Sequence, residues 1–314
     1  MFRTYKIIGL SMLKTIIFCL CLSFSHFAAA KSLALSFDDG LDPVLNSEAR
    51  YINNQILSTL KQHKIHAILY PSVSKIGGKE AIDIVSVWGE QGHRIGNHGN
   101  LHLNLNRNEI DLADYLQDMQ QGHDAFHQLQ GFVPRYRFPF LKEGNTLEKR
   151  EGVRQWLDQH QYQSGAVSID ASDWYYNQLF LKYQQVKDHK SLDQLKRAYI
   201  FHLLDRAEYY DQLAFKSLGR SPKHILLLHV LAINAAWLTD IIHAFTQQGW
   251  TFIDSDSAYQ DAIYQVQLNI LPAGESIVWG IAQVYGIEHL RYPAEDAVYE
   301  YATLNNFGLT INVD

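Results

Sequence analysis

The sequence predicts an α/β fold built on a parallel sheet. Short apolar segments that suit β-strands alternate with amphipathic helical segments along most of the chain, giving about seven strand–helix repeats. Polar residues that can carry chemistry follow the ends of several strand segments, as expected for loops at the carboxyl edge of a parallel sheet. The repeats alone leave open whether the sheet closes into a barrel or stays open and doubly wound.

The alternation assigns most elements of the fold. The expected strands cover 33–37, 66–70, 94–97, 136–138, 166–169, 225–228 and 251–253. The expected helices carry apolar residues at three- and four-residue spacing and cover 47–62, 79–91, 109–130, 146–160 and 235–248. No low-complexity or linker segment separates them, so we expect one domain over 31–314, with its core at 32–253.

Two segments lie outside this alternation. The run 175–222 predicts a mostly helical insertion, because Ser191 and Gln194 can form a capping box and Gly219 is suited to end a helix. The tail 255–314 predicts a further helix and an ordered loop, as a C-terminal extension of the same domain.

The first thirty residues resemble a secretory signal peptide. Basic residues precede a short apolar run, TIIFCLCLSF, which is followed by an Ala-x-Ala ending at Ala30. We therefore expect cleavage after Ala30 and an exported protein, periplasmic or secreted. A permanent membrane anchor is the alternative, although the apolar run is short for a bilayer span, and we expect no stable membrane insertion after cleavage.

Composition excludes several classes of function. Both cysteines, Cys19 and Cys21, lie in the expected signal, so the mature chain would have neither disulfides nor thiol catalysis. The formal net charge is −6, and the signal carries three basic residues and no acidic ones, so the mature chain would carry −9. An acidic protein is poorly suited to bind nucleic acid or anionic lipid through charge.

Adjacent carboxylates end the first predicted strand, in the sequence LALSFDDG. Asp38 and Asp39 would raise each other's pKa unless a cation or hydrogen-bond donor offsets their repulsion. Histidines follow the third strand in NHGNLH, where His98 and His102 could complete a metal site with one of the carboxylates. Asp39 could then bind the metal while Asp38 serves as a base, because neighbouring side chains of a strand point in opposite directions.

A second histidine pair, His123 and His127, has the same four-residue spacing. It lies within a predicted helix rather than at a strand end, and we interpret it as part of a solvated helix face.

Five motifs, SFDDG, NHGNLH, RFPF, DASDW and LLH, occur in this order, each at a strand end. Together they resemble the polysaccharide deacetylase family, the NodB-homology domain of carbohydrate esterase family 4, over about residues 32–253. The resemblance implies a distorted (β/α)7 barrel, decorated here by the insertion and the extension. It also implies hydrolysis of N-acetyl groups on a polysaccharide or oligosaccharide, with an acetylated glycan as substrate and one divalent metal, usually Zn²⁺, with Co²⁺ or Ni²⁺ as alternatives.

The resemblance also implies roles for individual residues. Asp38 would be the catalytic base and Asp39, His98 and His102 the metal ligands. Arg137 would hold the base, Asp170 would orient the acid, and His229 would be the general acid. The backbone at Phe140 would help bind the oxyanion, and Trp174 and Leu227 would line the substrate pocket. We also expect Tyr175 to contact substrate, because it follows Trp174 at the rim.

The chain departs from the family pattern at three positions. Leu41 stands where proline is common, and Ser36 replaces a more frequent threonine. Gly99 replaces a serine or threonine whose hydroxyl braces the histidine loop in the family, which leaves open how firmly the metal is held here.

Alternative functions remain at this stage. A serine esterase would need a Gly-x-Ser-x-Gly elbow, and the sequence contains none. The same five motifs would serve a relative acting on O-acetylated xylan or on another C–N bond. A catalytically weak, glycan-binding relative is a further possibility, although the expected base and acid are both present.

Overall fold

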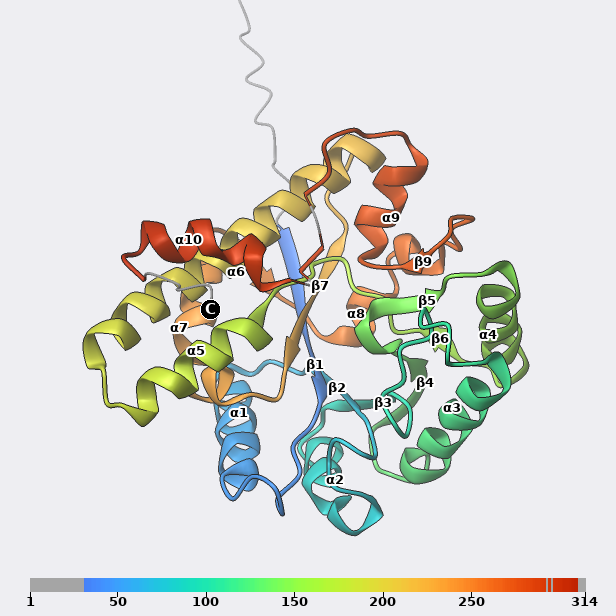
Figure 1. The fold of residues 1–314 in the computed structure, drawn as a ribbon, viewed down its shortest axis with the longest axis horizontal. Helices are drawn as coiled ribbons and strands as arrows, with labels where there is room; N and C mark the ends of the chain where they lie inside the picture. The colour runs from blue at the N-terminus through green and yellow to red at the C-terminus, as the bar shows by residue number, and fades with distance from the viewer. Residues whose placement is uncertain (1–30, 292, 295, 310–314) are drawn as a thin grey trace, which may run out of the picture.

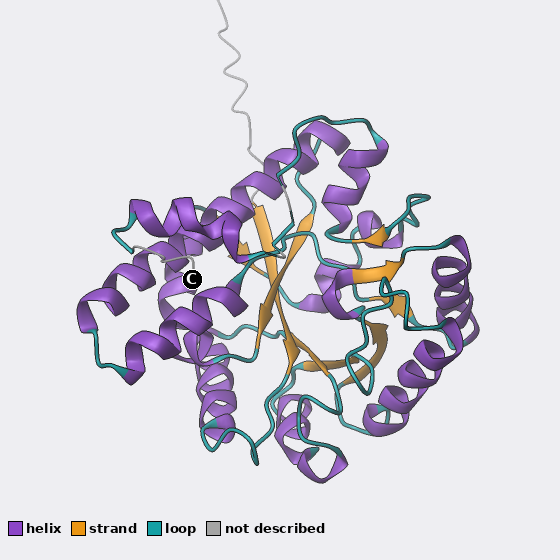
Figure 2. Cartoon of the chain, in the orientation of Figure 1, coloured by secondary structure: helices purple, strands orange, loops and turns teal. Residues whose placement is uncertain are grey.

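A curled sheet of seven parallel strands forms a half-barrel with helices around it (Figures 1 and 2). The computed structural model describes residues 31–291, 293–294 and 296–309, and the expected signal peptide lies outside them. The strand order is β6-β4-β3-β2-β1-β7, with β8 pairing with β1. These strands are β1 (Lys31–Asp39), β2 (Ile68–Pro71), β3 (Arg94–Asn97), β4 (Phe132–Tyr136), β6 (Gln163–Ser164), β7 (Lys223–His229) and β8 (Trp250–Phe252). The predicted parallel α/β fold of the curled, barrel-like type is confirmed.

Ten α-helices of the described residues accompany the sheet. They are α1 (Ala49–His63), α2 (Asp83–Glu90), α3 (Leu112–Phe126), α4 (Leu147–Gln159), α5 (Asp173–Gln185), α6 (His189–Leu218), α7 (Ala232–Gln247), α8 (Ser255–Tyr259), α9 (Ile277–Val284) and α10 (Tyr301–Asn306). Short 3₁₀ turns cover Lys79–Ala81, Pro139–Leu141, Ala262–Gln265 and Ala297–Glu300, and β5 (Lys142–Gly144) pairs with β9 (Ala273–Gly274) in a separate two-stranded sheet. None of the helices in the described ranges is long and apolar enough to cross a membrane.

Strand β1 lies at the centre of the sheet and sets the position of the site. Its segment Leu33–Phe37 is fully buried, as expected for a parallel strand covered on both faces. β1 pairs with β7 on one side, in a register that places Asp38 beside His229. On its other side it pairs with β8 at its start and with β2 at its end, where Asp39 lies beside Pro71. This register brings residues from distant parts of the sequence to one edge of the sheet.

The strand predicted at 166–169 contributes less to the sheet than expected. Regular pairing occurs earlier, at β6, and only Ile169 forms a further bridge, to Leu226 of β7. The strand predicted at 136–138 also lies earlier, as β4, because the chain turns at Pro139 into a 3₁₀ helix. Tyr136 still ends this strand, so Arg137 keeps its predicted place at the sheet edge.

The predicted insertion is a pair of helices, α5 and α6, on one side of the half-barrel (Figure 1). Helix α6 begins at His189, before the predicted capping box, because the Asp188 carboxylate accepts hydrogen bonds from the backbone and hydroxyl of Ser191. It ends as predicted at Gly219, whose φ of 71° suits glycine. The C-terminal extension supplies α8, α9 and α10.

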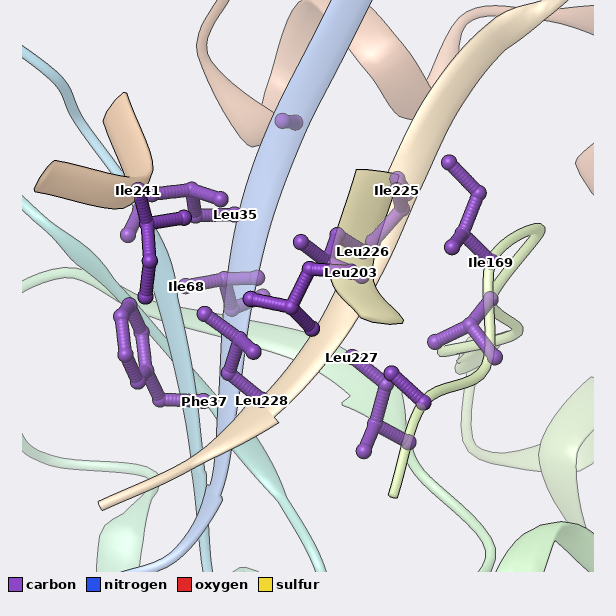
Figure 3. Packing of buried hydrophobic residues seen from close by; sticks show 14 of the residues in the cluster. Leu35, Phe37, Ile68, Ile169, Leu203, Ile225, Leu226, Leu227, Leu228 and Ile241 are labelled. Atoms are coloured by element: carbon purple, nitrogen blue, oxygen red, sulfur yellow. The ribbon is translucent and has the colours of Figure 1, made fainter. Parts of the chain in front are cut away.

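One large buried cluster joins the barrel, the insertion and the extension. It includes side chains from Leu33 to Leu309 and spans β1, β7, α6 and α7. Figure 3 shows part of it, with Leu35, Leu226 and Leu203 among the packed residues. A shared core favours a single domain over 31–314, and we propose this organisation.

Candidate active site

The first element of the site is a buried ion pair at the end of β1. Asp38 is only 2% exposed, and Arg137 donates from Nη1 to both of its carboxylate oxygens, at 3.0 and 2.9 Å. Arg137 also donates to Ser36 and stacks over the ring of Tyr70. Burial raises the pKa of Asp38 to about 6, and the Arg137 charge limits this rise. The arrangement holds one carboxylate rigidly in a position suited to a base.

The second element is a cluster of three possible metal ligands. Asp39, His98 and His102 bring one ligand atom each to within 4.8 Å of one another. Nε2 of His98 lies 3.6 Å from Asp39 Oδ1, and Nε2 of His102 lies 3.1 Å from the same oxygen. Burial would raise the pKa of Asp39, but the adjacent His102 ring lowers it well below its usual range.

These residues fit a divalent metal. Asp39 Oδ1 is buried and forms no hydrogen bond of acceptable geometry with the described residues, even though His102 Nε2 lies 3.1 Å away, as expected for an oxygen that shares a cation with this nitrogen. Nδ1 of His98 lies 2.7 Å from the carbonyl oxygen of Arg137, a contact that favours the tautomer whose free Nε2 can bind metal. Burial also lowers the pKa of His98 well below its ordinary value, which keeps the ring neutral. Two imidazoles and one carboxylate form a set that binds Zn²⁺ and similar ions with positions left open.

The third element is a histidine paired with a buried carboxylate. Nδ1 of His229 lies 2.7 Å from Asp173 Oδ1, and the His229 backbone N–H donates to Asp173 Oδ2 at 2.7 Å. Burial alone would lower the pKa of His229, but the Asp173 charge and hydrogen bond raise it to about 10. His229 is therefore protonated at neutral pH and suited to act as an acid.

The prediction that Asp170 orients this histidine is wrong. Asp170 Oδ2 accepts a hydrogen bond from the backbone N–H of Ala294 in the C-terminal extension, at 2.9 Å. Asp173, three residues later, is the first residue of α5, and this places its carboxylate against the end of β7. Both aspartates belong to the DASDW motif, and their spacing alone does not tell which one faces the histidine.

Two further residues extend the acid pair, and sequence reasoning missed them. Asn234 of α7 donates to Asp173 Oδ2 at 2.8 Å and to the carbonyl oxygen of His229 at 2.9 Å. Tyr199 of α6 donates in turn to Asn234 Oδ1 at 2.6 Å. Both are fully buried and belong to helical patterns that carry no motif, so no sequence signal marks them. Through this chain of contacts the insertion supports His229.

The loop that carries Asp173 is also fixed from the C-terminal extension. Ser172 donates to Glu300 Oε1 at 2.9 Å, and Nδ1 of His202 lies 2.9 Å from Glu300 Oε2. Trp174 donates through Nε1 to the carbonyl oxygen of Ala294 at 3.2 Å. The insertion and the extension thus hold the DASDW loop between them.

All three elements line one cleft of about 590 Å³. Phe140, Trp174 and Leu227, which are predicted to bind substrate, line it together with Leu231 and Ala294. Its apolar wall suits an acyl group. Asp170 also lines this cleft, although it does not contact His229.

Tyr175 does not belong to the cleft, and its predicted role as a substrate contact is wrong. It is 7% exposed and packs near Tyr301 of the C-terminal extension. The reason is helical geometry, because Tyr175 follows Trp174 on α5 and points about 100° away from it around the helix. The other histidine pair also lies elsewhere, with His123 and His127 stacked on each other along α3.

Four non-glycine residues at the cleft have left-handed backbone conformations. They are Asp39, His102, Phe140 and Leu141, with φ between 57° and 76°. Such conformations cost free energy in L-residues and concentrate where a site requires them. The ring of Phe140 meets that of His102 edge-on, with centroids 4.7 Å apart, so the strained turn of the RFPF motif packs directly on a candidate metal ligand.

Comparisons with known proteins address the family and the fold of this chain. The polysaccharide deacetylase family model matches residues 28–157, less than half of the chain. This range contains the expected base and metal ligands but not His229 or Asp173. A comparison with curated proteins finds no match.

Solved structures share the fold. A mutant of a CE4 family pseudoenzyme with restored enzymatic activity is 18% identical, with a TM-score of 0.51 over 74% of this chain and 68% of that chain. A mutant of the peptidoglycan deacetylase PdaC from Bacillus subtilis is 20% identical, with a TM-score of 0.50 over 74% of this chain and 92% of that one. A CE4 esterase from Streptococcus mutans is 21% identical, with a TM-score of 0.50 over 72% and 86%.

The pseudoenzyme neighbour shows that the fold alone does not decide activity, which depends on the side chains at the cleft. The sequence match nevertheless covers the first three of the five motifs, the shared fold agrees with it, and the predicted resemblance of this chain to the polysaccharide deacetylase family is confirmed.

Proposed function

We propose that the protein is a metal-dependent hydrolase that removes N-acetyl groups from a polysaccharide or oligosaccharide and releases acetate. The observation that carries this proposal is the presence of a fixed base and a protonated acid in the same cleft as a metal-ligand cluster. The metal would be held by Asp39, His98 and His102, and Zn²⁺ is the first ion to test. A divalent ion bound there supplies Lewis-acid activation of water and polarises the acetyl carbonyl.

The residues of the chain supply the proton transfers. Asp38, fixed by Arg137, accepts a proton from the attacking water as its oxygen bonds to the carbonyl carbon. The backbone at Phe140 is proposed to donate to the oxygen that develops negative charge. His229 then donates its proton to the amide nitrogen as the C–N bond breaks, which leaves acetate and a free amine.

The acid pair favours an amide over an ester as substrate. An amide nitrogen leaves poorly as an anion and must be protonated, whereas an alkoxide leaves more readily. The contact with the buried Asp173 carboxylate keeps His229 protonated at neutral pH, so this histidine can supply the proton that the nitrogen needs. This observation supports N-deacetylation over O-deacetylation of a xylan-type substrate.

Metal removal tests the proposal. Dialysis against a chelator is expected to lower acetate release from N-acetylated oligosaccharides or peptidoglycan fragments by about two orders of magnitude or more, and Zn²⁺ or Co²⁺ is expected to restore it. Acetylated xylan serves as the parallel substrate. Full activity after exhaustive chelation would contradict metal dependence. Acetate release from acetylated xylan alone would favour the ester reaction. Glycan binding without any acetate release would indicate a binding protein.

We also propose that the protein is exported and that its mature chain starts at Lys31. The pattern of residues 1–30 supports this. N-terminal sequencing of protein recovered from the periplasm or medium is expected to begin KSLALSFDDG. A chain that keeps its first thirty residues and sediments with membranes would support the anchor instead.

A further inference from the structure

The loop that carries both metal-ligand histidines lacks a bracing hydroxyl of its own. Its second residue is Gly99, with φ of 77°, a conformation that L side chains rarely adopt. The backbone of the loop is nevertheless hydrogen-bonded to neighbouring segments. The backbone N–H of Val73 donates to the carbonyl oxygen of Gly99, and that of Ser74 donates to the carbonyl oxygen of Asn100. The backbone N–H of His98 donates to the carbonyl oxygen of Pro71.

Helix α3 supplies the remaining contacts through one buried side chain. Asp118 is 2% exposed and accepts hydrogen bonds from the backbone N–H groups of Asn100, at 3.0 Å, and Leu101, at 2.6 Å. Its two oxygens therefore hold the two residues that lie directly before His102. Hydrogen bonds to an ionised carboxylate are stronger than those between neutral groups.

A second contact fixes the start of the loop to the same helix. Asn97 accepts from the Gly99 backbone N–H at 2.9 Å and donates to the carbonyl oxygen of Met119 at 2.9 Å. Helix and loop lie so close that a Cβ atom added at Gly122 would come within 2.2 Å of Asn97 Oδ1. Asp118 and Gly122 are one helical turn apart, so α3 presents a matched face to the loop.

Gly99 and Asp118 depend on each other. A Cβ atom added at Gly99 would lie 2.3 Å from Asp118 Oδ2, a distance that real contacts do not show. The carboxylate thus occupies the space that a serine or threonine side chain at position 99 would need. The glycine in the NHGNLH motif is explained by this neighbour as well as by its own backbone conformation.

We propose that Asp118 is a positioning residue that sets the relative placement of His98 and His102, and that Gly99 is its steric complement. The inference rests on the proposed function, because it assumes that these histidines bind a metal. An α3 carboxylate here replaces a hydroxyl within the loop. Ligands held at their binding spacing before the metal arrives need no ordering when it binds, which strengthens affinity.

Zinc affinity tests this role without reference to catalysis. The zinc dissociation constant of the full mature chain is measured by competition with a chromophoric chelator, for the wild type, Asp118→Ala and Asp118→Asn. Loss of the brace is expected to weaken zinc binding about 10- to 100-fold in Asp118→Ala, and less in the nearly isosteric Asp118→Asn. Asp124→Asn is the control, since it removes the same charge from an exposed position of the same helix. It is expected to bind zinc like the wild type.

Thermal unfolding separates positioning from general stability. A purely structural role would lower the melting temperature of the metal-free and zinc-loaded protein equally, whereas positioning also reduces the rise that zinc produces. If both Asp118 variants fold and bind zinc as tightly as the wild type, the inference is wrong. If the folded wild type binds no zinc, it is the proposed function that fails.

A double-mutant comparison tests the steric pairing of the two residues. Gly99→Ala alone is expected to weaken zinc binding, because its methyl group collides with Asp118 and its backbone is strained. Added to Asp118→Ala, the same change is expected to have a smaller effect, since the collision is gone and only the strain remains. If the fold-change in the dissociation constant of the double variant equals the product of the two single fold-changes, so that the binding free energies simply add, the complementarity of Gly99 and Asp118 is overturned.

Discussion

Asp38→Asn is expected to lower the turnover number for acetate release by about 10²- to 10⁴-fold, the usual contribution of a positioned base. Asparagine keeps the shape of the side chain and can still accept a hydrogen bond from Arg137, but it cannot take a proton from water. The KM for an N-acetylated oligosaccharide should change little, because the role proposed for Asp38 is to take a proton from water and not to bind the sugar. The measurement is steady-state acetate release at fixed, saturating Zn²⁺.

Zinc binding distinguishes the two adjacent carboxylates in this experiment. Asp38→Asn should keep the zinc dissociation constant close to that of the wild type, whereas Asp39→Asn should weaken it strongly, because only Asp39 belongs to the ligand cluster. Asp42→Asn, in the same turn, is the control and should leave both quantities unchanged. A folded Asp38→Asn variant with more than about a tenth of wild-type turnover would place the base elsewhere.

Asp173→Asn is expected to move the alkaline limb of the turnover profile to lower pH, by more than about one unit. The sign follows from the role of His229 as an acid. His229 must be protonated to donate, its protonated fraction falls as pH rises through its pKa, and the Asp173 charge raises that pKa to about 10. Removal of the charge lowers the pKa, so activity is lost at a lower pH than in the wild type.

Asp170→Asn is the matched comparison for this prediction. It removes a carboxylate from the same motif, but Asp170 bonds to Ala294 rather than to His229, so the alkaline limb should stay in place. Turnover measured from pH 6 to 10.5 with both variants decides between them. If Asp170→Asn moves the limb and Asp173→Asn does not, the original assignment from the motif was right and the contact in the structure is not the functional one.

The sequence predicted those parts of the site that depend on local pattern. The apolar run before Asp38 predicted a buried strand, and the other parallel strands of the same sheet were predicted to bring His98, Arg137 and His229 to the same edge. The insertion was predicted as helical from its capping residue and its terminal glycine, and the structure contains two helices there.

The sequence could not predict contacts that depend on how helices dock. Asp173 and Asp170 belong to one short motif, and the position at which α5 begins determines which of them faces His229. Tyr175 was assigned to the cleft from its neighbour Trp174, although successive helical residues face different directions. The contact between Asp118 and the histidine loop could not be predicted, because a single acidic residue in an amphipathic helix is expected to face solvent. Its burial depends on the loop that packs against the helix.

The first turn of α5 performs two tasks with adjacent residues. Asp173 holds the acid, and Trp174 forms part of the wall of the cleft. Any change that shifts this helix, such as a longer or shorter α5–α6 hairpin, would alter the room for the acyl group and the protonation of His229 at the same time. Relatives that differ in this hairpin should therefore differ in acyl preference and in pH optimum together, so that selection for one of these properties brings the other with it.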